Sequence, residues 1–251
     1  MTAAEKQKTA SFINLAGDFI STGYRSKYIE YDFNDDEENY SAHSIEKNDE
    51  TVFDMQDAKV DFIDKIAEKI KICRNCALAE KRINTVPGEG VKEPLVMVIG
   101  EGPGADEDAT GRPFVGKAGQ LLDKMLASID LSRDSNCFIA NIVKCRPPNN
   151  REPFPDEASA CEHFLHQQIV SLKPKYILCA GGVSSKNLLK TSNSVAKLRG
   201  KFFDFEIENL KIPVLVTYHP SALLHNDAYK RPAWEDLKLL RSSISDEHKI
   251  S

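Results

Sequence analysis

The sequence predicts an α/β fold in which a central parallel sheet of about four strands is flanked by helices, with an acidic, partly flexible N-terminal extension. Short apolar runs alternate with helical patterns from residue 95 onward, the order that parallel strands and crossover helices produce. Hydrophobic residues make up 41% of the 251 residues, enough for the packed core of one domain. Charge is divided unevenly along the chain, which separates an appendage from the body of the protein.

The expected strands are short apolar runs at residues 95–99, 138–143, 176–180 and 214–218. Between and after them, apolar positions spaced three and four apart predict helices over residues 117–129, 156–172, 184–189 and 233–244. An earlier apolar stripe from Val60 to Ile70 fits one face of a further helix, which leads into Cys73. Together these elements predict strand-helix units joined into one sheet.

The N-terminal part of the chain is acidic. Residues 1–66 carry 7 Lys and Arg against 15 Asp and Glu, whereas the rest of the chain carries 26 against 23. We therefore expect an acidic, partly disordered extension over residues 1–58 and a mildly basic domain over residues 59–251, where an anionic ligand could dock. Within the extension we expect a short helix near residues 12–19 and flexibility over residues 22–56, because so polar a stretch buries little.

The chain shows no sign of a membrane segment or a secretion signal. No window approaches the roughly 18 consecutive apolar residues of a membrane span, and the first residues lack the apolar core of a signal peptide. Six cysteines in a chain of this length are too few for a secreted disulfide scaffold. We expect a soluble, cytoplasmic protein whose thiols stay reduced, with no membrane contact.

Chemically useful side chains follow the predicted strands, and in open sheets ligands bind beyond the carboxyl ends of the strands. Glu101 and Glu107 come after the first strand in a glycine-rich segment, and Phe114 follows them. Asn141 lies in the second strand run, and His219 comes after the fourth. The sequence therefore predicts one cleft in which carboxylate, aromatic, carboxamide and imidazole groups converge.

Two glycine patterns in this region do not support nucleotide binding. The pair Gly100 and Gly102 resembles the start of a dinucleotide fingerprint, but the third glycine is out of register. The run from Gly111 to Lys117 resembles a phosphate loop, yet Ala118 replaces the Ser or Thr that would bind Mg²⁺. A nucleoside triphosphatase is therefore not indicated.

The cysteines divide into two groups. Cys137 and Cys179 lie in or beside predicted strands, where a small buried thiol is expected. The other four are enough for a four-thiolate site: Cys73, Cys76, Cys145 and Cys161. Structural zinc sites usually pair one C-x-x-C with a second close pair, whereas iron–sulfur clusters tolerate scattered ligands. Spacing alone leaves both open.

The chain resembles the family 4 uracil-DNA glycosylases over roughly residues 67–245. Four ordered segments carry the resemblance: GEGPG at residues 100–104, GRPFVGKAG at 111–119, NIVKCRPPNNR at 141–151 and HPSALL at 219–224. The resemblance implies the uracil-DNA glycosylase-like α/β fold and an enzyme of base excision repair, which hydrolyses the N-glycosidic bond of uracil in DNA and leaves an abasic site. It also implies a structural 4Fe-4S cluster on Cys73, Cys76, Cys145 and Cys161.

The same resemblance implies roles for the residues of the predicted cleft. Phe114 stacks on uracil, Asn141 binds its Watson–Crick edge, and His219 faces its O2 atom. Glu101 and Glu107 fall on the acidic positions of the family's active site, and Gly102 lies in the substrate-binding loop. The expected DNA contacts are Lys144, Arg146, Arg151, Arg199, Lys201 and Ser221, since basic side chains hold the phosphate backbone without reading sequence.

Physical chemistry explains why these groups suit the reaction. A base inside a duplex is inaccessible, so the enzyme must rotate it into a pocket at a cost of a few kcal/mol of unstacking. Stacking on Phe114 does not select, because every base has a π-face. Asn141 can donate to O4 of uracil and accept from N3–H, whereas cytosine offers mismatched groups there. A donor such as His219 stabilises the charge that develops on O2 by about 3 to 4 kcal/mol.

The sequence departs from the family pattern at two places and lacks a loop that related covalent binders carry. Gly102 stands where Ala is usual, which we expect to loosen the loop slightly. His225 stands where an Arg commonly follows the Leu-Leu pair, so one phosphate contact or loop anchor is lost. Related covalent uracil-DNA binders carry an inserted basic loop ending in His after the phenylalanine motif, whereas here the chain runs from Lys117 directly into a predicted helix, which disfavours covalent trapping of DNA.

We expect a monomer whose acidic extension contacts a protein partner or weakly inhibits the enzyme, and whose main partner is uracil-containing DNA. Two rival interpretations stay open at this point. The first is a non-catalytic iron–sulfur module that binds uracil-containing or single-stranded DNA without turnover. The second is a zinc-stabilised nucleotide-binding protein, which would be colourless in solution.

Overall fold

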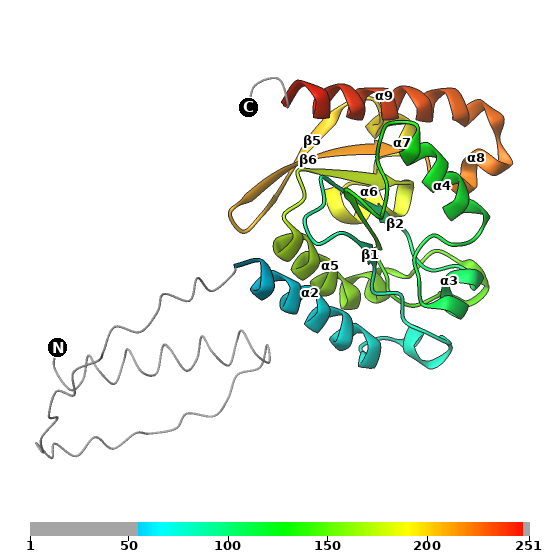
Figure 1. Cartoon of the computed structure of the whole chain (residues 1–251). Helices are drawn as coiled ribbons and strands as arrows, with labels where there is room; N and C mark the ends of the chain where they lie inside the picture. The colour runs from blue at the N-terminus through cyan, green and yellow to red at the C-terminus, as the bar shows by residue number, and fades with distance from the viewer. Residues whose placement is uncertain (1–54, 248–251) are drawn as a thin grey trace, which may run out of the picture. The chain divides into compact units, whose positions relative to one another are not determined.

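The computed structural model describes residues 55–247, which Figure 1 shows coloured along the chain. The short helix expected near residues 12–19 and nearly all of the expected flexible stretch, residues 22–56, lie outside the described residues. The first described element is α2 (Met55–Ile72), which contains the apolar stripe that predicted a helix. The division of the chain at residue 58 stays a prediction.

A six-stranded sheet forms the centre of the domain, in the order β1-β3-β2-β4-β6-β5. The four inner strands β3, β2, β4 and β6 are parallel, and β1 and β5 pair antiparallel at the two edges. The α/β class and the four parallel strands are therefore confirmed. The strands are β1 (Glu89–Gly90), β2 (Val96–Gly100), β3 (Cys137–Asn141), β4 (Tyr176–Ala180), β5 (Phe202–Ile207) and β6 (Leu210–Thr217).

The helices predicted after residue 100 are confirmed to within three residues at each end. They are α4 (Lys117–Ala127), α5 (Pro155–Leu172), α6 (Gly182–Leu189) and α9 (Lys230–Glu247). Three short helices were not predicted: α3 (Ala105–Thr110), α7 (Val195–Leu198) and α8 (Pro220–His225). Each has four to six residues, too short for a helical hydrophobic period to show in the sequence.

Helices cover both faces of the sheet and divide the core into two layers (Figure 1). Met97 and Ile99 of β2 belong to the apolar cluster that includes residues of α2 and α5. Val96 and Val98 point to the other face and join the cluster that includes α4 and α9. Since side chains alternate along a strand, a run that is buried at all five positions requires a cover on each face.

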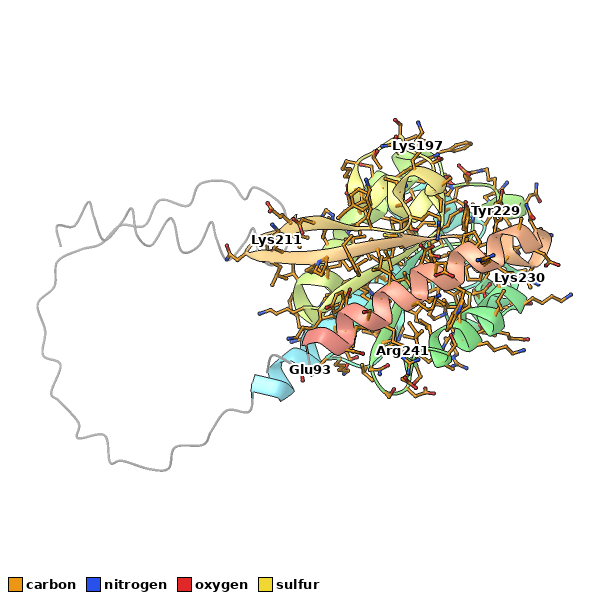
Figure 2. The ribbon with its side chains drawn as sticks, turned by 90° about the horizontal axis from the view of Figure 1, so that it is seen from above. Glu93, Lys197, Lys211, Tyr229, Lys230 and Arg241 are labelled. Atoms are coloured by element: carbon orange, nitrogen blue, oxygen red, sulfur yellow. The ribbon has the colours of Figure 1, made fainter. Side chains whose placement is uncertain are left out.

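The last long helix crosses the sheet, as Figure 2 shows from above. Leu237 and Leu240 of α9 are almost fully buried against the sheet, and each such side chain contributes about 1.5 to 3 kcal/mol. On the outer side, Arg241 Nη2 donates to Asp130 Oδ2 at 2.9 Å, which ties α9 to the segment after α4. No helix in the described part of the chain has the length and apolarity needed to cross a membrane.

Candidate active site

A pocket of about 330 Å³ lies at the carboxyl ends of the parallel strands, large enough to hold a single nucleobase. The structure brings together there all six residues expected to act on the base, together with Arg151 and Ser221. The lining comprises Glu101, Gly102, Pro103, Gly104, Glu107, Phe114, Ala118, Asn141, Pro147, Asn150, Arg151, Gly181, Gly182, His219 and Ser221. Segments far apart in the sequence thus meet at one place, as the strand-end rule predicts.

Phe114 forms one wall of the pocket. Its backbone has φ of 53°, the left-handed conformation, which costs a non-glycine residue about 1 to 3 kcal/mol. Its ring centroid lies 5.6 Å from that of His219, at an interplanar angle of 32°. A Cβ atom at Gly100 would lie 2.5 Å from Phe114 Cζ and 2.4 Å from Asn141 Oδ1. Only glycine at position 100 therefore lets both side chains take these places.

Glu107 holds the loops on either side of α3. Its Oε2 atom accepts from the backbone of Gly104 at 3.0 Å, and Oε1 accepts from Val115 and Gly116 at 2.8 and 2.9 Å. Three amide donors on one carboxylate make strong charge-assisted bonds. Glu107 therefore fixes the two chain segments that border the pocket, in addition to lining it.

Asn141 ends β3 and is 1% exposed. Its Oδ1 atom is buried and has no hydrogen-bond partner among the described residues. Buried acceptors are normally satisfied, and leaving one unpaired costs about 1 to 3 kcal/mol. A ligand in the pocket that carries an N–H group beside a carbonyl would meet this unsatisfied carboxamide.

His219 caps the N-terminus of α8 and lines the pocket. Its Nδ1 atom accepts from the backbone of Ser221 at 3.2 Å and lies 2.7 Å from Ser221 Oγ. Because Nδ1 accepts, the proton of the neutral ring resides on Nε2. Burial lowers the pKa of His219 to about 4, and the nearby charge of Glu107 opposes this only in part. A neutral imidazole donor is therefore held in the site at neutral pH.

Glu101 follows β2 and is half-buried at the pocket. Burial raises the pKa of Glu101 to about 7, and the negative charge of Glu152 adds to the effect. A carboxyl group with a pKa near the working pH is well suited to take a proton from water. The two acidic residues of the site thus have different environments, since the carboxylate of Glu107 already accepts hydrogen bonds from three backbone amides.

Lys144 is not a DNA contact, and that prediction was wrong. The side chain is 1% exposed, and its Nζ atom donates to the backbone oxygen of Asn141 at 2.9 Å and to Gln168 Oε1 at 2.7 Å. Burial lowers the pKa of Lys144 to about 8. A cation so enclosed cannot reach a phosphate; it holds the end of β3, where Asn141 lies.

Of the remaining expected DNA contacts, only Arg151 and Ser221 border the pocket. Arg151 makes two hydrogen bonds to Glu157, at 2.8 and 2.7 Å, and lies over the ring of Phe154. The others lie outside the pocket lining: Arg146 donates to Asn150, Arg199 binds Asp236, and Lys201 lies over Phe203. Their contacts with phosphate stay predictions.

A second cavity joins the four cysteines that the sequence grouped together. It lies between α2, the segment after β3 and α5, and it is lined by Ile70, Cys73, Asn75, Cys76, Ala79, Arg82, Lys144, Cys145, Ala160, Cys161 and Phe164. Arg82 Nη1 donates to Cys145 Sγ at 3.1 Å, and burial raises the pKa of Cys161 to about 11. Among the described residues, no three His, Cys, Asp or Glu side chains gather closely enough to hold a single metal ion.

The cavity fits a group that takes four thiolates. Thiolates are anionic ligands, and the Arg82 donor together with the buried ammonium of Lys144 offsets their charge. Apolar residues such as Ile70 and Phe164 also contribute to the lining. The other two cysteines are buried in strands as predicted, and burial raises the pKa of Cys137 and of Cys179 to about 12.

Sequence reasoning missed one residue that shapes the site. Arg133 lies outside the pocket, yet it donates to the backbone oxygens of Pro113 and Phe114 at 2.8 and 2.9 Å. It comes before β3 in a polar segment that resembles a solvated loop. No motif signals it, because the contact joins residues 19 positions apart through backbone oxygens.

The fold and the pocket define an α/β protein whose ligand site lies at the carboxyl edge of a parallel sheet. Residues 87–238 match the model of the uracil DNA glycosylase superfamily. The chain is also similar to proteins named type-4 uracil-DNA glycosylase. It is 43% identical over 193 residues to the protein of that name from Saccharolobus solfataricus. The aligned region covers 75% of this chain and 89% of that protein.

Two further relatives with the same name have similar identity. The Sulfurisphaera tokodaii protein is 43% identical over 187 residues, covering 72% of this chain and 84% of its own length. The Pyrobaculum aerophilum protein is 42% identical over 181 residues, covering 70% and 92%. The chain belongs to the uracil DNA glycosylase superfamily and, within it, to the type-4 group, which confirms the family that the four segments predicted.

Proposed function

We propose that the protein removes uracil from DNA by hydrolysing the N-glycosidic bond, leaving an abasic site for repair. The observation that carries the proposal is the pocket in which Phe114, Asn141 and His219 meet from three separate segments. Membership of the type-4 group supports it, since the relatives carry that activity in their names. The proposed partner is uracil-containing DNA.

Recognition of the base depends on Asn141. Its carboxamide can accept from N3–H of uracil and donate to O4, which would satisfy the acceptor that has no partner among the described residues. Cytosine presents an amino group and an unprotonated N3 at these positions, so it would leave mismatched groups buried. The ring of Phe114 supplies stacking that does not discriminate between the bases.

Cleavage requires charge to be stabilised on both fragments. As the bond from C1′ to N1 breaks, its electron pair passes to uracil, and much of the negative charge resides on O2. The Nε2–H group of His219 would donate a hydrogen bond to O2 and stabilise this negative charge. The imidazole ring stays neutral as it does so. Water then forms a bond to C1′ and gives its proton to the carboxylate of Glu101, for which the raised pKa is suited.

The proposed cofactor is a 4Fe-4S cluster held by Cys73, Cys76, Cys145 and Cys161, which line one cavity. A bound cluster would cross-link the segment directly after α2, which carries Cys73 and Cys76, to the segment after β3 and to α5. Lys144 borders this cavity and also binds the backbone of Asn141, so the cysteine-lined region supports the strand end from which Asn141 projects. We assign the cluster no part in the chemical step.

We also propose that the enzyme acts as a monomer in the cytoplasm, and that the basic residues near the pocket mouth hold the DNA backbone. Arg151 is best placed among them, because its two bonds to Glu157 fix the guanidinium at the pocket. The acidic extension, residues 1–58, is the proposed region for a contact with a protein partner.

An oligonucleotide with a single uracil tests the function. The iron-loaded full-length chain should produce an alkali-labile site at the uracil, and an otherwise identical cytosine oligonucleotide should stay intact. A shift of the labelled DNA in a gel without any alkali-labile product would instead identify a non-catalytic binding module. Iron and labile sulfide analysis of the same preparation separates the cluster from zinc.

A further inference from the structure

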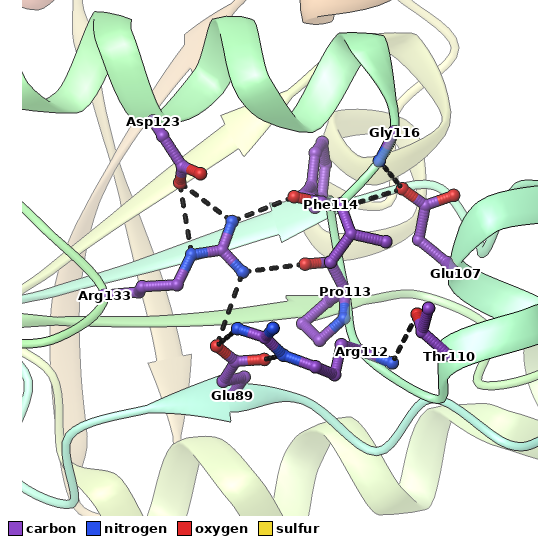
Figure 3. Close-up of polar contacts among 10 residues, drawn as sticks. Glu89, Glu107, Thr110, Arg112, Pro113, Phe114, Gly116, Asp123 and Arg133 are labelled. Carbon is purple, nitrogen blue, oxygen red and sulfur yellow. Dashed lines mark hydrogen bonds and ion pairs between the residues drawn. The ribbon is translucent and has the colours of Figure 1, made fainter.

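We propose that Arg133 is a positioning residue for base stacking, which fixes the left-handed turn at Phe114 from behind the pocket. The inference rests on the proposed function only in assigning the ring of Phe114 to a nucleobase. Figure 3 shows the contacts: the guanidinium lies between the side chain of Asp123 and the backbone oxygens of Pro113 and Phe114. Arg133, Asp123 and Pro113 lie outside the pocket lining, whereas Phe114 belongs to it, so Arg133 acts on the pocket through the loop.

The guanidinium is held on every side by acceptors. Nη1 donates to the backbone oxygen of Pro113 at 2.8 Å, and Nη2 donates to that of Phe114 at 2.9 Å. Nε and Nη2 also donate to Asp123 Oδ1 at 3.1 and 2.8 Å, while Nη1 lies 3.6 Å from Glu89 Oε1. The side chain is only 9% exposed. Two carboxylates therefore offset the buried charge and orient its planar fork.

The loop at Phe114 needs such support because its conformation is unfavourable. The φ of 53° at Phe114 is a rare conformation for a side chain of this size. On the far side of Phe114, Glu107 accepts from the backbone amides of Val115 and Gly116. Opposite charges thus hold the backbone on the two sides of the Phe114 ring. The cation of Arg133 binds the backbone oxygens, and the carboxylate of Glu107 binds the backbone amides (Figure 3).

Gly119 closes the same arrangement from α4. A Cβ atom at Gly119 would lie 1.9 Å from the backbone oxygen of Phe114, so that oxygen lies against the helix and points to Arg133 rather than to water. An unpaired backbone oxygen in this place would be costly. The site geometry therefore requires a donor at the position that Arg133 fills.

Lysine could not replace this arginine. Its single ammonium is a point charge, whereas the planar guanidinium donates to two backbone oxygens and a carboxylate at once. Arg112 provides a matched control in the same network. It binds Glu89 at 2.7 and 2.8 Å through its side chain but makes no side-chain bond to the Phe114 loop oxygens.

The first test compares Arg133→Met with Arg112→Met in the full-length protein. We expect kcat/KM for uracil release to fall about 10- to 100-fold in Arg133→Met, since a displacement of about 1 Å has effects of this size. Inhibition by free uracil should weaken by a similar factor, while affinity for uracil-free DNA stays within about twofold. Arg112→Met should stay within about twofold of the wild type on all three measurements.

A double-mutant cycle separates positioning from general stability. In a Phe114→Leu background, Arg133→Met should cause less than about a twofold further loss, because the ring it positions is already absent. An equal loss in both backgrounds would overturn the proposal. Should Arg133→Met fail to fold, as judged by circular dichroism, Arg133→Lys goes through the same cycle with the same expectation.

A measurement that does not depend on uracil release distinguishes failure of this proposal from failure of the proposed function. With 4-fluorophenylalanine at position 114, ¹⁹F spectra of the otherwise wild-type chain should show one narrow resonance. Arg133→Met should broaden or split that resonance, and Arg112→Met should not. An unchanged spectrum in Arg133→Met would refute positioning even if uracil release is found, whereas a broadened spectrum in an inactive protein would refute only the function.

Discussion

Asn141 is the residue on which base selection depends. Asn141→Asp places a carboxylate where the site needs a donor to O4 of uracil, and it can accept from the amino group of cytosine. We expect uracil release to fall at least about 100-fold, the usual cost of removing a donor in such a site. Measuring kcat/KM on matched uracil and cytosine oligonucleotides checks this.

The cytosine arm of that comparison is informative in its own right. Asn141→Asp should reduce the ratio of kcat/KM for uracil to that for cytosine, because the amino group of cytosine now meets the acceptor that the Asp carboxylate provides. Unchanged discrimination would show that another group reads the Watson–Crick edge.

His219 is expected to act in the neutral form. Removing its donor in His219→Ala should lower kcat by about 10²- to 10³-fold with little change in KM, because the bond to O2 strengthens as charge develops. Single-turnover kinetics on a uracil oligonucleotide measure this. A change confined to KM would instead assign the ring a role in ground-state binding.

Glu101 gives the reaction its pH dependence. Burial raises the pKa of Glu101 to about 7, so the carboxylate that accepts the proton is present above that pH and is lost below it. The rate of uracil release should therefore decline as the pH falls from 8 to 6, on the order of tenfold per unit well below the pKa. Since burial keeps the pKa of His219 near 4, that ring stays neutral throughout this range.

The variant Glu101→Gln isolates the effect. It should be slow at every pH and show no decline between pH 8 and 6, because the amide does not titrate. Persistence of the wild-type profile in Glu101→Gln would assign the titration to another group.

At the residue scale, the residues that line the pocket could be predicted from the sequence better than the residues that hold the surrounding backbone in place. Asn141 and His219 could be found because each stands at or just after a strand end, and Phe114 because it lies in the recognisable segment 111–119. Lys144 was misassigned because a lysine among arginines and prolines resembles an exposed group, and only the fold shows that Gln168 and a backbone oxygen enclose it. Arg133 carries no local signal, since its partners are backbone oxygens of a distant loop.

At the scale of elements, the cysteine cavity joins α2 to α5. Cys161→Ala removes one of the proposed cross-links, and loss of a native disulfide, which is a comparable cross-link, typically costs about 2 to 5 kcal/mol. For a protein of this size that corresponds to a fall in Tm of roughly 4 °C or more. Calorimetry, together with iron analysis, measures both effects.

Cys179→Ala is the matched control, because Cys179 is also buried but lies in β4, outside the cavity lining. It should lose some stability by forming a small cavity yet keep its full iron content. Equal iron content in both variants would contradict the ligand assignment.

The elements themselves were predictable where their hydrophobic pattern is long or continuous. The inner strands β2, β3 and β4 are buried at every position, and the long helices repeat their apolar positions over several turns. The edge strands escaped prediction for physical reasons. β1 has only two residues, and β5 has no fully buried residue because an edge strand contacts the core on one side.

For the whole molecule, the uneven charge predicts how the acidic extension affects DNA binding. Its net negative charge repels the phosphate backbone, so deletion of residues 1–54 should tighten binding to DNA several-fold at low salt. The gain should fade as salt approaches about 1 M, where the Debye length is near 3 Å. A fluorescence anisotropy titration at several salt concentrations measures this, and equal affinity throughout would contradict an inhibitory extension.

The central claim is that one pocket both selects uracil and breaks its bond to deoxyribose. The most direct measurement quantifies free uracil and abasic sites released from a labelled duplex by the iron-loaded full-length chain, beside Asn141→Asp. The account predicts equal amounts of the two products from the wild type and at least about a 100-fold slower release from the variant. DNA that is bound but yields no free uracil, or a variant as fast as the wild type, would contradict it.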